Sequence, residues 1–354
     1  EVITNSQLSG RRNIVINGAM GVAQRSASVT GIGAASGYFT LDRWYLEAGN
    51  TAGRLTMTQT ADGPVGFANC MKLDCTTADA SIAAGELLVL QQHIEGQDVQ
   101  AIGKGVSGAK QITLSFYVKA NAAFDFNAEI QDQDNGRTNG KLFATTTDWV
   151  RHEITFEADA DDGSSPFDDD NAKSLSVNFW LHGGSTFTSG TLASGWENTT
   201  NANRAAGIDS FYSNTNNNFF ITGLQLEVGS VATPFENRSF GEEFNLCERY
   251  FQVVAAAANG GICSGWQQSS GDSRGILKFP PMRAAPTIAQ DETANYFKFE
   301  RNGGSDVLSV LSVAYSKTTS CLIYDDNTSS GTAGHGGGLY TNNASAYLHL
   351  LSEL

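Results

Sequence analysis

Short stretches with an apolar residue at every second position recur along this chain, and they restrict its fold more than any other feature. In the clearest, Gln111–Lys119, the apolar residues Ile112, Leu114, Phe116 and Val118 alternate with Thr, Ser, Tyr and Lys. A period of two is expected for a strand with one buried sheet face. Turns rich in Gly, Asn and Asp separate these stretches, and helical segments do not alternate with them. The pattern predicts an all-β protein.

Strand candidates fall into two groups. About eight to ten of them in the first ~220 residues favour a two-sheet β-sandwich of the jelly-roll type. These are Tyr38–Leu46, Leu55–Thr60, Cys70–Cys75, Glu86–His93, Lys110–Lys119, Phe124–Gln131, Trp149–Glu157, Ser174–His182 and Phe219–Val228. A second, smaller β-sandwich is expected from Arg249–Ala255, Ile276–Phe279, Thr287–Ala289, Tyr296–Glu300, Val307–Tyr315, Cys321–Tyr324 and Tyr347–Leu351.

A short helix is predicted between the two groups. Ser239 followed by Glu242 fits a capping box. An apolar stripe at helical spacing follows it, made of Phe240, Phe244, Cys247 and Phe251. The predicted organisation is an N-terminal arm at 1–12, a jelly-roll sandwich at 13–236, a linker helix at 237–248 and a C-terminal sandwich at 249–354.

Composition excludes several classes of partner. The chain has 22 basic and 37 acidic residues and a formal charge of −15, which repels nucleic acid and anionic membrane surfaces. No apolar run reaches the ~18 residues of a membrane span. The five cysteines are odd in number and predict neither a disulfide framework nor a zinc site, which fits assembly in a reducing cytoplasm. Cys70 and Cys75 are expected to be small buried groups, with a bridge between them as the alternative.

Two long segments resemble a family of bacteriophage virion proteins. They are GRRNIVINGAMGVAQRSASVTGIGAASGYFTLDRWYLEAGN at Gly10–Asn50 and QLEVGSVATPFENRSFGEEFNLCERYFQ at Gln225–Gln252. The resemblance extends to PPMRAAPTI at Pro280–Ile288. Members are described as tail-fibre or structural proteins of marine phages and prophages, and the family has no agreed catalytic motif. The resemblance implies a place in the virion after assembly in the host cytoplasm, a homotrimer, and contacts with other virion proteins.

A second resemblance covers a shorter part of the chain. TDWVRHEITFEA at Thr147–Ala158 and GLQLEVGS at Gly223–Ser230 are similar to strands of jelly-roll carbohydrate-binding modules. The similarity spans about Thr147–Gly229. It implies that a sugar is the ligand.

Two glycine-containing motifs suggest a hydrolase at first sight. Gly261–Gly265 reads G-x-C-x-G, a thiol version of the nucleophile elbow, and His335–Gly338 reads HGGG. In hydrolases with such an elbow, the HGGG-type loop precedes it, whereas here it follows. Both motifs are therefore predicted to be glycine turns, and the chain is predicted not to be an enzyme.

Acidic clusters raise the possibility of a bound cation. Asp168, Asp169 and Asp170 are consecutive, Asp159, Asp161 and Asp162 precede them, and Asp132 and Asp134 lie earlier. Calcium needs six to eight oxygen ligands, which a dense acidic loop can supply. A solvated acidic loop is the expectation, and calcium at Asp168, Asp169 and Asp170 is the alternative. No other cofactor is predicted.

Sugar binding by β-sandwiches relies on exposed aromatic rings backed by polar side chains. Trp196 and Tyr212 lie in an Asn-rich loop, Trp266 is followed by two glutamines, and His335 lies in a glycine loop. These four are the predicted ligand-binding residues, with packing of Trp196 against its own loop or a sister subunit as the alternative. Trp44, Trp149 and Trp180 lie in alternating runs and are predicted to be core.

These observations predict a non-enzymatic phage virion protein, a tail fibre or adhesin that attaches to a glycan of the bacterial surface. Weak sites on three subunits would combine into avidity. A capsid-associated decoration or tail connector with a structural role is one alternative. A polysaccharide depolymerase is the other.

Overall fold

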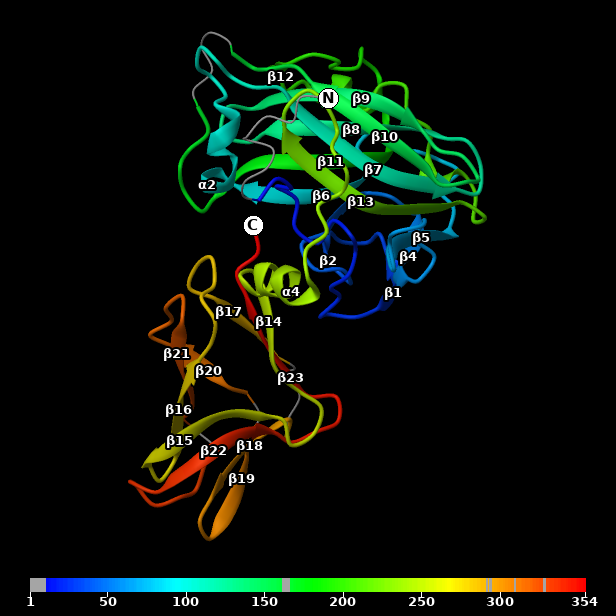
Figure 1. Cartoon of the computed structure of the whole chain (residues 1–354). Helices are drawn as coiled ribbons and strands as arrows, with labels where there is room; N and C mark the ends of the chain where they lie inside the picture. The colour runs from blue at the N-terminus through cyan, green and yellow to red at the C-terminus, as the bar shows by residue number, and fades with distance from the viewer. Residues whose placement is uncertain (1–10, 161–165, 291, 293–294, 309, 327–328) are drawn as a thin grey trace. The chain divides into compact units, whose positions relative to one another are not determined.

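The chain folds into two units of β-structure, as a computed structural model shows (Figure 1). The structure describes residues 11–160, 166–290, 292, 295–308, 310–326 and 329–354. One unit comprises Glu1–Glu243 together with Leu354, and the other comprises Phe244–Glu353. The division falls inside helix α4 (Phe240–Glu248), in the segment predicted as a linker. Of the predicted N-terminal arm, residues 1–10 lie outside the described residues.

The N-terminal unit is a sandwich of a six-stranded and a seven-stranded antiparallel sheet. The six-stranded sheet has the order β1 (Ser28–Ile32), β4 (Arg54–Thr60), β5 (Cys70–Thr77), β13 (Asn218–Val228), β7 (Ile112–Ala120) and β10 (Val150–Phe156). The seven-stranded sheet has the order β12 (Glu197–Asn198), β9 (Arg137–Ala144), β8 (Asp125–Asp132), β11 (Lys173–Gly183), β6 (Leu87–Glu95), β3 (Tyr45–Gly49) and β2 (Gly37–Tyr38). The predicted all-β, jelly-roll-like fold is confirmed.

Alternate residues of both sheets form one hydrophobic core between them. Phe116 of the six-stranded sheet lies 5.0 Å from Phe179 of the seven-stranded sheet, measured between ring centroids. Phe126 lies 5.6 Å from Phe219 in the same way. All four rings are fully buried, and burying each stabilises the fold by about 1.5–3 kcal/mol. The alternation seen in the sequence therefore places one face of each sheet in the core.

Short helical turns connect the strands of this unit. They are α2 (Gly96–Val99), η1 (Gln100–Ile102), α3 (Ser185–Thr188), η2 (Asn201–Asn203) and η3 (Phe211–Ser213). None of the helices in the described part of the chain is long and apolar enough to cross a membrane.

The C-terminal unit contains two further antiparallel sheets with a core of their own. The three-stranded sheet has the order β14 (Phe251–Ala256), β23 (Tyr347–Leu351) and β17 (Thr287–Gln290). The seven-stranded sheet has the order β19 (Gly304–Leu308), β18 (Phe297–Arg301), β22 (Gly336–Thr341), β15 (Gly261–Ser269), β16 (Asp272–Lys278), β21 (Ser320–Asp325) and β20 (Ser312–Ala314).

The predicted capping box at the start of α4 is confirmed. The Ser239 amide and hydroxyl both donate to Glu242 Oε2, at 2.8 and 2.7 Å. The Glu242 amide donates to Ser239 Oγ at 3.3 Å. The predicted apolar stripe is only partly buried, because Cys247 is buried whereas Phe240 is 66% exposed.

Two predicted strands are wrong as single elements. The predicted Tyr38–Leu46 strand is broken between β2 and β3, where Arg43 adopts a φ of 72° that an extended strand does not allow. The predicted Val307–Tyr315 strand is divided into the end of β19 and a separate β20. Local alternation is present in both segments, but the backbone leaves the strand conformation between their apolar residues.

The two predicted glycine turns are instead paired strands. Gly261–Gly265 lies in β15 and Gly336–Gly338 begins β22, with Ser264 opposite Gly338. Glycine is needed here because neighbouring strands are close: a Cβ at Gly265 would lie 2.2 Å from the Arg274 carbonyl oxygen. Burial, with a smaller effect of Cys321, raises the pKa of the Cys263 thiol to about 12. A protonated thiol is a poor nucleophile, so Cys263 is suited to be a residue of strand β15 and not a nucleophile.

Cys70 and Cys75 both lie on β5 as buried free thiols. Burial is the main cause that raises the pKa of each to about 11. They pack as small apolar groups, as the sequence predicts.

Candidate functional site

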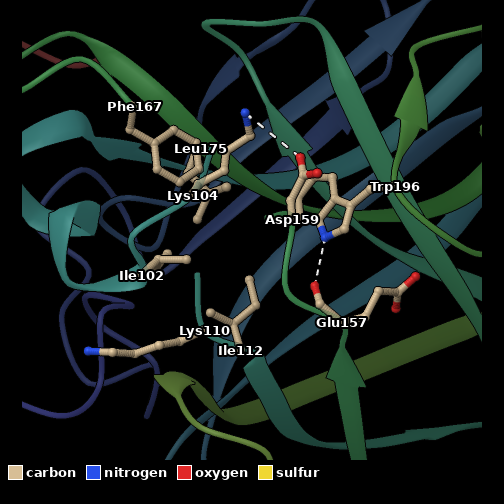
Figure 2. A pocket seen from close by; sticks show the side chains of 9 residues that line it. All are labelled: Ile102, Lys104, Lys110, Ile112, Glu157, Asp159, Phe167, Leu175 and Trp196. Atoms are coloured by element: carbon tan, nitrogen blue, oxygen red, sulfur yellow. Dashed lines mark hydrogen bonds and ion pairs between the residues drawn. The ribbon is translucent and has the colours of Figure 1, made fainter. Parts of the chain in front are cut away.

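Trp196, a predicted sugar-binding residue, packs inward in the N-terminal unit. Its indole contacts the hydrophobic core, and its Nε1–H donates to the Glu157 carbonyl oxygen at 2.8 Å. Figure 2 shows the ring beside a small cavity that Phe167 and Leu175 also line. The cavity measures about 10 Å³, which is at most the space of one water. It cannot hold a sugar.

Tyr212, the second predicted ligand-binding residue, is buried, and this prediction is wrong. Its side chain has no exposed surface and lies 5.3 Å from the His182 ring, between centroids. A Cβ at Gly53 would lie 2.4 Å from the Tyr212 ring, so backbone covers the tyrosine closely. The Asn-rich loop around Tyr212 misled the prediction, because η3 turns the ring into the core.

Trp266 and His335 are neighbours in the C-terminal unit. Trp266 lies on β15, and the amide of the next residue, Gln267, donates to the His335 carbonyl oxygen at 2.8 Å. The Trp266 Nε1–H donates to Gln268 Oε1 at 2.9 Å. The structure brings these two predicted residues together and places Trp196 and Tyr212 in the other unit, so the four do not form one site.

The predicted calcium ligands do not converge. Asp168, Asp169 and Asp170 are exposed, and Asp170 Oδ1 accepts from the Ala172 amide at 2.8 Å. No group of three or more His, Cys, Asp or Glu side chains suited to a metal ion occurs among the described residues. Among the described residues, the three side chains therefore do not form a ligand cluster for calcium. Asp161 and Asp162 lie outside the described residues.

Two of the other acidic residues do converge, and the cation between them is a lysine. Lys104 Nζ lies 2.6 Å from Asp132 Oδ2. It also lies 3.8 Å from Asp159 Oδ2, and Figure 2 shows this ion pair. Arg137 donates to both oxygens of Asp159, at 2.9 and 3.1 Å. The three side chains Lys104, Asp132 and Asp159 are almost fully buried. This cluster is a buried ion network of the fold.

A Ser–His–Glu chain resembles hydrolytic machinery but is enclosed. His182 Nδ1 is 2.8 Å from Ser210 Oγ, and His182 Nε2 is 3.1 Å from Glu86 Oε2. His182 has no exposed surface, and burial is the main cause that lowers its pKa. A substrate cannot reach this histidine, so the hydrogen bonds from His182 to Ser210 and Glu86 stabilise the sandwich.

The outer face of the seven-stranded sheet in the N-terminal unit carries a polar groove. On β11, Leu175, Val177 and Phe179 enter the core, so Ser176 and Asn178 lie on the opposite face. Register places His93 and Gln131 on either side of Ser176. The groove encloses about 370 Å³, a size typical of small-molecule sites. Its lining consists of Tyr45, Glu47, Gln91, His93, Gln131, Gln133, Lys173, Arg204 and Leu354.

A buried carboxylate holds one side of this groove in place. Glu129, which is 1% exposed, accepts from Arg204 Nε at 2.9 Å and from Arg204 Nη2 at 2.7 Å. It also accepts from Asn178 Nδ2 at 2.7 Å, from Trp180 Nε1 at 3.0 Å and from Thr138 Oγ1 at 2.7 Å. Burial opposes its charge, but Arg204 and these hydrogen bonds outweigh burial and lower the pKa of Glu129. Arg204 is thereby fixed against the sheet.

The opposite side of the groove is aromatic. Tyr45 on β3 is half-buried, and its ring lies 5.1 Å from Tyr38 and 5.6 Å from His93, between centroids. His93 Nδ1 is 2.9 Å from Ser176 Oγ. Beside the ring, Gln91 Nε2 donates to Glu47 Oε2 at 2.8 Å. An aromatic surface therefore lies next to side-chain amides and a carboxylate.

We expect acid to destabilise this unit partly through His93. Burial above all, with the charges of Lys173 and Arg43, lowers the pKa of His93 from 6.5 to about 3. Between these values the unfolded chain binds the proton more readily, so stability falls as pH falls from about 6.5 towards 3, by about 1.4 kcal/mol per pKa unit. Thermal unfolding at pH 7 and 4.5 measures this. The His93→Gln variant should lose less stability on acidification than the wild type, and an equal loss would contradict the assignment.

The groove was not predicted from the sequence, although a signal was present. Polar residues recur at every second position in three runs that were predicted as strands, for example Gln91 and His93, Glu129 and Gln131, and Ser176 and Asn178. Apolar residues at the intervening positions made these runs look like core strands only. The polar residues become a site because β6, β11 and β8 are neighbours, which is set by pairing between distant segments.

Comparison with known proteins gives only distant likenesses. No protein-family model and no curated protein matches the chain. Among solved structures, one described as "CBM4 structure and function" is 12% identical, with a TM-score of 0.33, 60% of this chain covered and 97% of that chain. The family 11 carbohydrate-binding module of a Clostridium thermocellum cellulosomal cellulase is 14% identical, with a TM-score of 0.28, 56% of this chain covered and 99% of that chain.

An enzymatically active domain of a tailspike protein from bacteriophage CBA120 is also similar. It is 12% identical, with a TM-score of 0.31, and the match covers 61% of this chain and 21% of that chain. Likenesses at this level agree with a β-sandwich and carry no argument about function.

Proposed function

We propose that the chain is a non-enzymatic attachment protein that binds a glycan in the groove of its N-terminal unit. The observation that carries this proposal is the mixture of hydrogen-bonding groups left available there. Lys173 Nζ and Arg204 Nη1 are donors without a hydrogen bond to the described residues, and Glu47 Oε1 and Gln91 Oε1 are acceptors without one. A sugar hydroxyl both donates and accepts, so it suits such a mixed set.

Tyr45 supports the same ligand class. A half-buried ring held by Tyr38 and His93 presents a fixed apolar surface to one face of a sugar ring. Nucleic acid fits less well, because the chain carries a net charge of −15 and the groove contains the carboxylate of Glu47.

Binding without cleavage is the role that Glu129 favours. Glycosidases need a carboxylic acid with a raised pKa to protonate the leaving group. Glu129 has a lowered pKa, and its oxygens accept hydrogen bonds from four side chains. Glu129 therefore suits a structural anion rather than a general acid.

We further propose that the chain acts in a phage virion as a tail fibre or adhesin, as a homotrimer beside other virion proteins. The resemblance of Gly10–Asn50 and Gln225–Gln252 to phage virion proteins supports this. Three grooves would combine weak affinities into strong attachment to the host surface. Light scattering on the purified chain measures the oligomer, and a monomer would contradict the trimer.

The binding proposal is tested with surface polysaccharide of the host bacterium and a glycan array. We expect the wild type to bind, and Tyr45→Ala combined with Gln91→Ala to weaken binding about tenfold or more through lost stacking and hydrogen bonds. Tyr315→Ala is the control, because Tyr315 is 82% exposed in the other unit. Equal melting temperatures of the variants exclude unfolding as the cause.

Three results would overturn parts of this proposal. Absence of glycan binding, with tight binding to a virion protein, would favour a tail connector or capsid decoration. Unchanged glycan binding by the double variant would place the site elsewhere. New reducing ends on the polysaccharide would make the chain a depolymerase.

A further inference from the structure

Lys173 contributes a positive charge to the groove. Among the described residues, no acidic side chain lies at salt-bridge distance from it. It begins β11, its side chain is half-buried, and it lines the groove. Burial lowers the pKa of Lys173, Glu47 acts in the opposite direction, and Arg204 lowers it further. A partly desolvated ammonium without an ion pair is costly, so an anion delivered by a ligand would be favourable there.

Arg204 supplies a second cation in the same groove. Its Nε and Nη2 atoms are occupied by Glu129 and Gln131, whereas Nη1 has no hydrogen bond to the described residues. The guanidinium lies over the Trp180 ring, with Cζ 4.8 Å from the ring centroid. Because Glu129, Gln131 and the Trp180 ring fix the guanidinium, its Nη1 atom has a fixed position from which to donate. A charged N–H donor of this kind is suited to an oxygen of a carboxylate or sulfate.

Glu47 attracts both cations and acts to raise the pKa of each, but it forms no salt bridge with either of them among the described residues. The terminal residue Leu354 also lines the groove, and its carbonyl oxygen accepts from the Tyr38 hydroxyl at 3.2 Å. Glu129 is bound to Arg204, and Glu47 is bound to Gln91 beside Tyr45. The groove therefore has an aromatic, amide-lined side and a side with two cations. A ligand that fits both sides has a sugar ring for the first and a negative charge for the second.

We propose, given the glycan-binding function above, that the ligand is an acidic glycan whose anionic group, a carboxylate or a sulfate, is bound by Lys173 and Arg204. The sugar ring next to this group packs on Tyr45. Acidic sugars are thereby selected over neutral sugars of the same shape.

The test uses matched polysaccharide pairs with the full chain. Polygalacturonate, alginate and hyaluronate are each compared with their carboxyl-reduced forms, and carrageenan is compared with its desulfated form. We expect at least one acidic member to bind about tenfold or more tightly than its neutral partner, with affinity falling as salt is raised. Lys173→Met should remove this difference. Lys72→Met is the control, because Lys72 lies on β5 of the other sheet and pairs with Asp74.

The outcomes separate this inference from the function on which it rests. Equal binding of acidic and neutral partners, still lost in the Tyr45→Ala and Gln91→Ala double variant, would overturn the acidic preference and leave glycan binding intact. An acidic preference that persists in Lys173→Met would also overturn it. If neither form of any pair binds while the wild type binds neutral host polysaccharide or a neutral array glycan, the acidic preference is wrong and glycan binding stands; if nothing binds in either experiment, both proposals are wrong. Loss of preference on carboxyl reduction or on desulfation identifies which anion is bound.

Discussion

Replacing Lys104 with methionine is expected to lower the free energy of unfolding of the N-terminal unit by about 3–5 kcal/mol. The Lys104 side chain is 1% exposed and lies 2.6 Å from Asp132 and 3.8 Å from Asp159. Methionine keeps most of the volume but removes the charge, so two buried carboxylates lose their shared cation. Arg137 compensates for Asp159 only. Urea unfolding at pH 7, followed by tryptophan fluorescence, measures the loss.

A matched control and a second substitution make this prediction specific. Lys141→Met removes a lysine that is 30% exposed on β9, and surface charges contribute little, so a change within about 1 kcal/mol is expected. Combining Lys104→Met with Asp132→Asn should restore part of the loss, because one uncompensated charge is removed together with its partner. If Lys104→Met is as stable as the wild type, the ammonium is not the counter-ion of these carboxylates.

Replacing Glu129 with alanine is expected to lower the free energy of unfolding by a similar amount, about 3–5 kcal/mol, and to abolish the proposed glycan binding as well. Four side chains donate to this carboxylate, namely Thr138, Asn178, Trp180 and Arg204. Without it, the Arg204 guanidinium is left without its counter-ion, and the Trp180 indole N–H loses its acceptor. Arg204 would no longer be held towards the groove.

Two further variants distinguish loss of the fold from loss of the site. Glu129→Gln keeps the size of the side chain but places an NH2 donor opposite side chains that also donate. We therefore expect an intermediate loss of stability. Glu153→Ala, at a glutamate that is 49% exposed on β10, should change neither property measurably. Urea unfolding and calorimetric titration with the polysaccharide report the two effects. Full glycan affinity in a folded Glu129→Ala variant would show that Arg204 has no part in binding.

The sequence predicts most strands because the signal for them is local. Ile112, Leu114, Phe116 and Val118 alternate in β7 as predicted, and all four are buried. Local signals fail where glycine has a role other than turning the chain. Gly336–Gly338 were predicted as a turn, yet Gly337 lies in β22, where a Cβ would lie 2.6 Å from the Phe299 ring. Close approach of a neighbouring strand, which a single sequence does not reveal, accounts for that glycine.

The candidate site depends still more on distant pairing. Tyr45, Gln91 and Gln131 belong to β3, β6 and β8, and the groove exists because β6 pairs with β3 on one side and with β11 on the other. The prediction instead favoured aromatic residues in loops. Tyr212, in such a loop, is buried, whereas Tyr45 was assigned to an early strand and not considered as a ligand contact.

The alternation along β11 also limits which sequence changes the groove can accept. Ser176 and Asn178 face the groove side, and Leu175, Val177 and Phe179 between them belong to the core. An insertion of one residue in this strand would exchange the two sets and place amides and hydroxyls in the core. Under the proposed function, recognition of a different glycan would therefore have to arise by replacement of side chains at fixed positions, or in the connecting loops, where length is free to vary.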